Sequence, residues 1–229
     1  MTIKHALFTC LLVTFSTWAF ADTHQQFVEK AIAKFQASER GKWAFTYHHN
    51  EIEEGEKTDI FAQYFPQNPR GERWQLLKLN GASPTQKQVK DFASKRENEG
   101  YSIKLTELIN PQSLTIEKET AQTITFSYPV QLADLGKDAI GKLMGTVKIN
   151  KSSASIEEVN IINTDEFSPV ALADISHFKL NMQFQTINDS VLPKSSYMEM
   201  SGTFSFFIDI EETSKTVFSD YQFLGAKQL

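Results

Sequence analysis

The chain has 229 residues, a formal net charge of −5 and 22% charged residues. This balance argues against nucleic acid as a partner, because a polyanion binder needs a basic field and no Lys/Arg cluster longer than Lys95-Arg96 occurs. It also argues against attraction to an anionic membrane by charge alone. The single cysteine, Cys10, lies near the N-terminus, so the remaining chain can form no internal disulfide and offers no thiol for catalysis.

Residues 1–21 have the features of a signal peptide. Lys4-His5 gives a positive start, an apolar run follows, and Ala19-Phe20-Ala21 is the small-x-small pattern that signal peptidases cleave. We therefore expect cleavage after Ala21, export to the bacterial periplasm, and one mature β-rich domain over residues 22–229. The apolar run is shorter than the roughly 20 apolar residues of a membrane span, so we expect no transmembrane segment in the mature chain.

The mature segment opens with the pattern of an amphipathic helix, which we expect to end at Gly41. Its apolar residues recur with the period of 3.6 that places them on one face. They are Phe27, Val28, Ala31, Ile32 and Phe35.

From Lys42 the period changes to 2, which predicts strands. Three strands are expected, over 42–50, 59–66 and 72–80, with the acidic turn 53–56 joining the first two as a hairpin. We expect Trp43 and Trp74 to pack these strands onto the N-terminal helix. A ligand-stacking surface for sugars or lipids is the alternative for the same aromatic side chains.

A second helix is predicted after the turn at Asn80-Gly81. Ser83 provides an N-cap, Pro84 suits the first turn, and Gln86 completes a capping box. Gly100 is expected to stop the helix. Its strongly charged exposed face indicates that it covers an end or rim of the sheet.

The rest of the chain is a succession of short β runs. Short turns between them leave no room for crossover helices, so the sheet is expected to be antiparallel. The predicted fold class is mainly β with two or three helices, as a single curved antiparallel sheet or incomplete barrel with helices covering one face. The runs are 113–120, 122–129, 144–151, 155–163, 178–187, 198–210 and 216–224.

Two of these runs carry apolar stripes, because every second residue is apolar and the residues between are mostly polar. The stripes contain more apolar side chains than two short helices need to cover. We therefore predict a hydrophobic ligand-binding lining there. Its residues are Phe178, Leu180, Met182 and Phe184 in the first stripe, and Phe204, Phe206, Ile208 and Ile210 in the second.

No catalytic or metal motif is predicted. Residues 136–143 have the spacing of a phosphate-binding loop, but Leu143 stands where a hydroxyl would hold magnesium and a β run follows. His48 and His49 are adjacent in a strand and project to opposite faces, so they cannot chelate one ion. The acidic residues of 51–56 belong to a solvated turn, and no G-x-S-x-G elbow is present. We expect no cofactor, while a Ser/His pair formed by folding stays open.

The order of elements resembles the lipoprotein-carrier class of periplasmic proteins (LolA/LolB-like), and the likeness covers most of residues 22–229. That resemblance implies an incomplete barrel capped by helices. Residues 71–85, GERWQLLKLNGASPT, also look like a block of an uncharacterised exported bacterial protein family.

The sequence thus supports three functional hypotheses. The first is a non-catalytic periplasmic binding or carrier module for an acyl or lipid-like ligand. The second is an envelope scaffold or interaction protein with a filled core and an envelope protein as partner. The third is a hydrolase with an unrecognised site, which would need converging polar residues that the linear sequence does not display.

Overall fold

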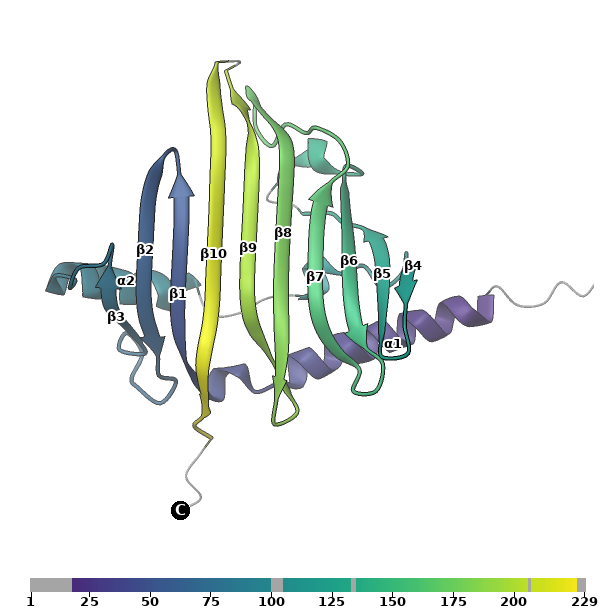
Figure 1. Ribbon diagram of the computed structural model, residues 1–229, viewed down its shortest axis with the longest axis horizontal. Coiled ribbons are helices and arrows are strands. Elements are labelled where there is room, and N and C mark those ends of the chain that lie inside the picture. The colour runs from purple at the N-terminus through teal and green to yellow at the C-terminus, as the bar shows by residue number, and fades with distance from the viewer. Residues whose placement is uncertain (1–17, 100–104, 133–134, 206, 226–229) are drawn as a thin grey trace, which may run out of the picture.

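The computed structural model describes residues 18–99, 105–132, 135–205 and 207–225. Ten antiparallel strands form one open sheet with the order β3-β2-β1-β10-β9-β8-β7-β6-β5-β4 (Figure 1). The predicted fold class, mainly β with helices on one curved antiparallel sheet, is confirmed. The strands are β1 (Trp43–Glu53), β2 (Glu56–Tyr64), β3 (Trp74–Leu79), β4 (Thr115–Glu119), β5 (Thr123–Pro129), β6 (Leu143–Asn150), β7 (Ser155–Asn163), β8 (Ala173–Ile187), β9 (Ser190–Phe204) and β10 (Ile208–Phe223).

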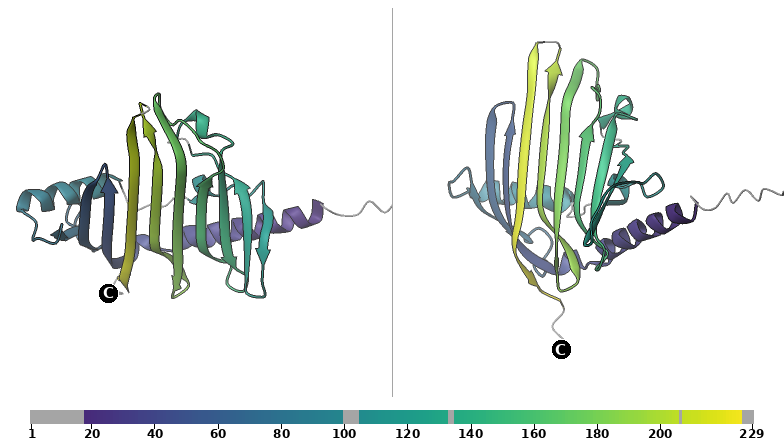
Figure 2. Two further views of the ribbon diagram at one scale, coloured as in Figure 1. Left: turned by 45° about the horizontal axis from the view of Figure 1, so that its top comes forward. Right: turned by 45° about the vertical axis from the view of Figure 1, so that its right-hand side comes forward.

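The described helices are α1 (Trp18–Ala37), α2 (Gln86–Glu99) and α3 (Leu105–Leu108). Helices α1 and α2 cover two different parts of the same face of the sheet (Figures 1 and 2). Helix α1 lies against β7 and β9, and α2 lies against β3 at the edge. The face of the sheet that these helices cover is called the inner face below.

Helix α1 buries the predicted apolar side chains Val28, Ala31, Ile32 and Phe35. It ends at Ala37 and not at the expected Gly41, which lies in a 3-10 turn over Arg40–Lys42. Two local bonds accompany the earlier end: the Ser38 backbone N–H and hydroxyl donate to the Lys34 carbonyl over 3.2 and 3.0 Å. The helix therefore stops where a side chain competes for its last carbonyl groups.

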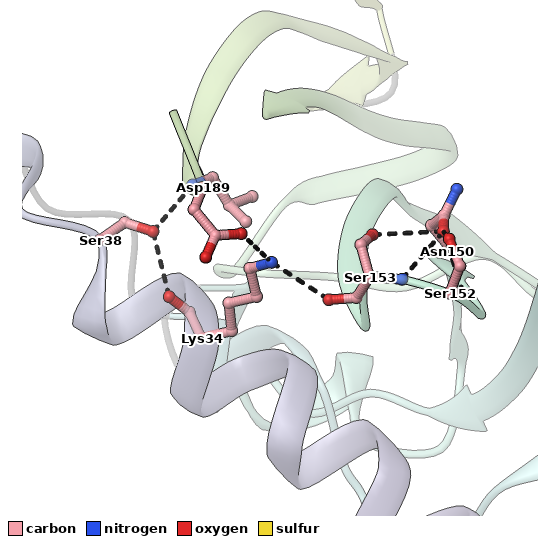
Figure 3. Close-up of polar contacts among 7 residues, drawn as sticks. Lys34, Ser38, Asn150, Ser152, Ser153 and Asp189 are labelled. Atoms are coloured by element: carbon pink, nitrogen blue, oxygen red, sulfur yellow. Dashed lines mark hydrogen bonds and ion pairs between the residues drawn. The ribbon is translucent and has the colours of Figure 1, made fainter. Parts of the chain in front are cut away.

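Polar contacts tie the end of α1 to two hairpins of the sheet (Figure 3). The Lys34 ammonium donates to the Ser153 carbonyl oxygen over 3.1 Å and to Asp189 Oδ1 over 2.8 Å. Ser38 Oγ accepts the Val191 backbone N–H over 2.8 Å. These bonds connect α1 to the β6–β7 turn and to the start of β9.

Helix α2 begins two residues later than predicted. Its capping box joins Thr85 and Gln88: the Thr85 N–H donates to Gln88 Oε1 over 2.8 Å, and the Gln88 N–H donates to Thr85 Oγ1 over 3.3 Å. Ser83 is not the N-cap, because Ala82 is still held in a bridge with Leu79. Ser83 and Pro84 therefore belong to the connection between the sheet edge and the helix.

The predicted strand over 198–210 is wrong, because the chain reverses within it. Ser205 adopts a φ of +51°, and the Phe207 N–H donates to the Phe204 carbonyl over 3.3 Å, which closes the β9–β10 hairpin. Strand β9 also begins eight residues before the predicted start. Pro193 lies in β9 beside a bulge in the β8–β9 pairing. It also lies beyond the last residue of β9 that pairs with β10, so β10 loses no hydrogen bond through the missing proline N–H.

The inner face carries two separate hydrophobic clusters. The first, the large core, combines α1, α3, the loop after β5, and strands β5–β9. The second, the small core, lies under α2. Its buried members are Phe45, Tyr47, Ala62, Tyr64, Trp74, Ala93 and Phe218.

Candidate functional site

The first predicted ligand stripe lies on β8 and forms part of the large core. Phe178, Met182 and Phe184 are buried, and Leu180 is partly buried against them. The Phe35 ring of α1 meets the Phe184 ring edge-on with centroids 5.3 Å apart. The predicted apolar alternation is confirmed, and α1 contributes to its cover.

The second stripe is divided by the β9–β10 turn. Phe204 and Ile208 lie opposite each other across the hairpin and are exposed, whereas Ile210 is partly buried against the large core. Phe206 lies outside the described residues. The second stripe is therefore not one continuous row along a strand, because its residues lie on two strands and on the turn between them.

A cavity with a mostly apolar wall lies elsewhere, between α2 and β3. It has a volume of about 610 Å³. This size is within the range typical of small-molecule sites, about 300–1,000 Å³. Its wall combines apolar side chains with polar ones, which are those of Asn68, Glu72, Gln75, Gln86 and Lys90. The apolar members are Trp74, Leu76, Leu77, Pro84, Val89 and Ala93.

A β-bulge shapes the sheet side of this α2–β3 cavity. Phe61 pairs with Lys78 and Ala62 with Leu76, so Leu77 is an extra residue in β3. Leu76 and the extra residue Leu77 both line the cavity.

Aromatic packing holds the Trp74 wall of the cavity in place. The Trp74 ring lies 5.1 Å from Tyr64, 5.4 Å from Tyr47 and 6.0 Å from Phe92 of α2, measured between centroids. The expectation that Trp74 packs onto the N-terminal helix is therefore wrong, because α2 covers β1–β3. Trp43 packs instead against Tyr221 and Phe223.

A polar network centred on His49 adjoins the small core. His49 Nδ1 lies 2.9 Å from Thr216 Oγ1, and His49 Nε2 lies 3.7 Å from Glu51 Oε2. The ring stacks on Tyr47, whose hydroxyl accepts a 2.8 Å bond from Arg96 of α2. Burial lowers the pKa of His49, the nearby Glu51 carboxylate opposes this, and Arg96 adds to it.

The His49 network joins a hydroxyl, an imidazole and a carboxylate, which are groups used in proton transfer. Sequence reasoning kept a Ser/His pair open, whereas the hydroxyl beside His49 belongs to a threonine. This pair was not identified because Thr216 lies 167 residues from His49, and the β1–β10 pairing brings them together. His48 contacts Asp59 instead, which confirms that the two histidines project to opposite faces.

A second cavity, of about 510 Å³, lies where β7 and β8 separate. Their pairing ends at Glu158 and Gln183, so the first residues of β7 have no ladder partner on β8. Lys148, Lys194 and several carboxylate and amide side chains line this opening. The buried Ser155 Oγ, also in its wall, has no hydrogen-bond partner among the described residues. Such a wall suits a polar group and not an acyl chain.

Motif-based alternatives find no support in the described residues. Within these ranges, no group of three or more His, Cys, Asp or Glu side chains is arranged to hold a metal ion. Residues 136–143 connect β5 to β6 through a 3-10 turn and do not enter an α-helix. The described helices include none with the length and apolar character needed to cross a membrane.

Comparison of the chain with protein-family models, with curated proteins and with solved structures gives no match.

Proposed function

We propose that this protein is a non-catalytic binding or carrier module for an acyl or lipid-like ligand, and that the ligand binds in the α2–β3 cavity. The observation that carries the proposal is the apolar wall of this cavity, about 610 Å³ in volume. Burying an apolar chain against such a wall removes both surfaces from water, which contributes about 25 cal/mol per Å². The polar side chains at the cavity are available to the ligand's polar end.

The packing behind the cavity supports this proposal. Trp74, Leu76 and Ala93 are almost completely buried, so the wall is firmly held, while Val89 is only partly buried. A preformed wall keeps the cost of ordering the site low. We extend the proposal to compartment: residues 1–21 direct export, and the mature chain acts in the periplasm.

The proposal is tested with a fatty acid whose chain carries bromine, which quenches tryptophan fluorescence on contact. Chain cleaved after Ala21 retains only Trp43 and Trp74, and Trp74 alone lines the cavity. We expect saturable quenching that disappears in Trp74→Phe. Lipid extraction of protein purified from the periplasm should recover the natural ligand.

A matched pair of helix variants locates the site. Val89→Glu places a carboxylate in the cavity wall and should weaken binding at least tenfold. Lys87→Glu makes a larger charge change on an exposed part of α2 that does not line the cavity, and should leave binding near wild type. Equal loss in both variants, or wild-type protein that is lipid-free and shows no quenching, would disprove the proposal.

An interaction protein is the second candidate function, and one observation favours it. Within the described ranges β3 is an edge strand that pairs with β2 alone, and the α2–β3 cavity adjoins it. An extended peptide could add to this edge and place apolar side chains in the cavity. A photo-crosslinker at Leu77 distinguishes the two candidates: a protein partner supports the interaction module, and a lipid adduct supports the carrier.

A further inference from the structure

One end of the sheet carries a group of exposed apolar side chains that neither core nor cavity uses. The group, called the apolar tip, lies on the loop before β8 and on the β9–β10 hairpin. Isolated exposed apolar residues are normal, but several together mark an interaction surface. The exposed fractions are 62% for Val170, 55% for Leu172, 39% for Phe204, 90% for Phe207 and 59% for Ile208.

Backbone contacts hold the two parts of the tip together. The Ser205 N–H donates to the Leu172 carbonyl over 2.7 Å, and Phe204 pairs with both Ala173 and Ile208. The ends of β8, β9 and β10 also project beyond the neighbouring ends of β1 and β7 (Figure 1). The tip is thus a preformed projection at the end of the sheet remote from α1.

The charges around the tip narrow the choice of partner. Segments 160–178 and 199–214 contain no Lys or Arg. The adjoining turn contains Lys137 and Lys142, and the Lys142 ammonium is paired with Asp138 over 2.9 Å. Carboxylates next to the apolar residues include Asp174 on β8, with Asp209 and Glu211 on β10. Like charges would oppose contact with a second copy or with an anionic lipid surface.

A zwitterionic lipid surface fits both features. Its outermost groups are ammonium ions, which are attracted to carboxylates lying just behind an inserted side chain. The hydrocarbon boundary below them accepts aromatic and aliphatic side chains one at a time. A protein partner would instead need a pocket shaped to fit the tip. The Phe207 side chain is 90% exposed and can enter a lipid surface without such a pocket.

We propose that the apolar tip docks the protein on zwitterionic lipid surfaces, with Phe207 and Ile208 inserting and the adjacent carboxylates facing the ammonium headgroups. This contact is separate from the α2–β3 cavity and does not depend on the function proposed for it. It is peripheral, since only side chains at the tip enter the lipid. A docking contact of this kind is weakly dependent on salt, because apolar insertion supplies the attraction.

Flotation with phosphatidylcholine vesicles tests the proposal on the full chain. We expect wild-type protein to float with these vesicles both at about 50 mM salt, where charges are weakly screened, and at about 500 mM salt, where they are strongly screened. Phe207→Asp should reduce the bound fraction at least tenfold, and Phe207→Leu should retain most of it. Because Phe207 is exposed, circular dichroism should show both variants folded.

A control variant replaces another exposed aliphatic residue, far from the tip. Ile116, 41% exposed on β4, is changed to Asp and compared with Ile208→Asp. Only the Ile208 variant should lose binding. Failure of wild-type protein to float, equal loss in both Ile variants, or binding to phosphatidylglycerol alone that salt abolishes would each overturn the proposal. A photo-crosslinker at Phe207 that labels a protein and no lipid would also overturn it.

Discussion

The large and small cores cover the same face of one sheet but are closed in different ways. Helix α1 closes the large core with a row of buried apolar residues and is tied down by Lys34 and Ser38. Helix α2 closes the small core through Phe92 and Ala93, and leaves the apolar α2–β3 cavity beside the edge strand. A cavity also lies beside α1, next to Ile32, but its volume is smaller, about 240 Å³. The helix that crosses several strands therefore leaves less space beside it than the helix at the sheet edge.

The largest expected effect comes from removing a side chain of the large core. Phe35→Ala removes a completely buried ring that packs on Phe184 and lies 3.9 Å from the Arg40 guanidinium carbon. The lost packing should lower the free energy of unfolding by about 3–5 kcal/mol. Phe92→Ala, where the ring is only partly buried, should cost clearly less. Urea unfolding of both variants measures the difference, and equal losses would contradict the distinction between the two cores.

A pH effect is expected on the small core. The pKa of His49 is lowered in the folded protein, chiefly by burial, so the unfolded state binds more protons as pH falls through about 6.5. The stability that neutral His49 contributes is therefore fully present above pH 6.5. It is lost as the pH falls from 6.5 to the lower folded pKa. Melting temperatures between pH 8 and pH 5 should fall more in wild type than in His49→Gln.

Glu212 acts in the opposite direction at lower pH. Burial, followed by the nearby Glu53 and Glu51 carboxylates, raises its pKa, so the folded state favours the protonated carboxyl. The stability that the protonated Glu212 carboxyl contributes is lost as pH rises through its folded pKa. Glu212→Gln should remove this loss. If His49→Gln showed the same pH profile as wild type, titration of His49 would not contribute to the pH dependence of stability.

The smallest expected effect concerns the tie on α1. Lys34→Met removes the ion pair to Asp189 and the bond to the Ser153 carbonyl while keeping an unbranched side chain. Asp189 is 89% exposed, so solvent screening limits the loss to about 0.5 kcal/mol. Amide hydrogen exchange should nevertheless increase in the last turn of α1 and remain unchanged in α2. Unchanged exchange in α1 would show that apolar packing alone holds the helix end.

Much of the fold could be predicted because it is local. The alternation from Trp43 directly specifies β1. The β9–β10 reversal was missed because Phe204, Ser205 and Phe207 lack the usual glycine or asparagine of a tight turn, so apolar alternation suggested an uninterrupted strand. Ser205 adopts the positive φ there.

The candidate site was predicted less well. The Phe178 stripe was correctly identified as apolar, but sequence could not show how much of it α1 would cover. The α2–β3 cavity depends on where α2 lies relative to Trp74, and no spacing in the sequence gives that position. The exposed state of Phe207 was likewise hidden, because a pattern of apolar residues does not distinguish a core from a protruding turn.

By itself, the sequence determined the strand-rich composition, the antiparallel hairpins and the amphipathic helices, since these follow from periodicity and turn chemistry within short segments. Only the tertiary structure decided that β1 pairs with β10, which assembles the His49 network and brings the two meanders into one sheet. It also decided which apolar faces are covered. The physical reason is that such contacts join residues far apart in the chain, and packing of the whole molecule selects them.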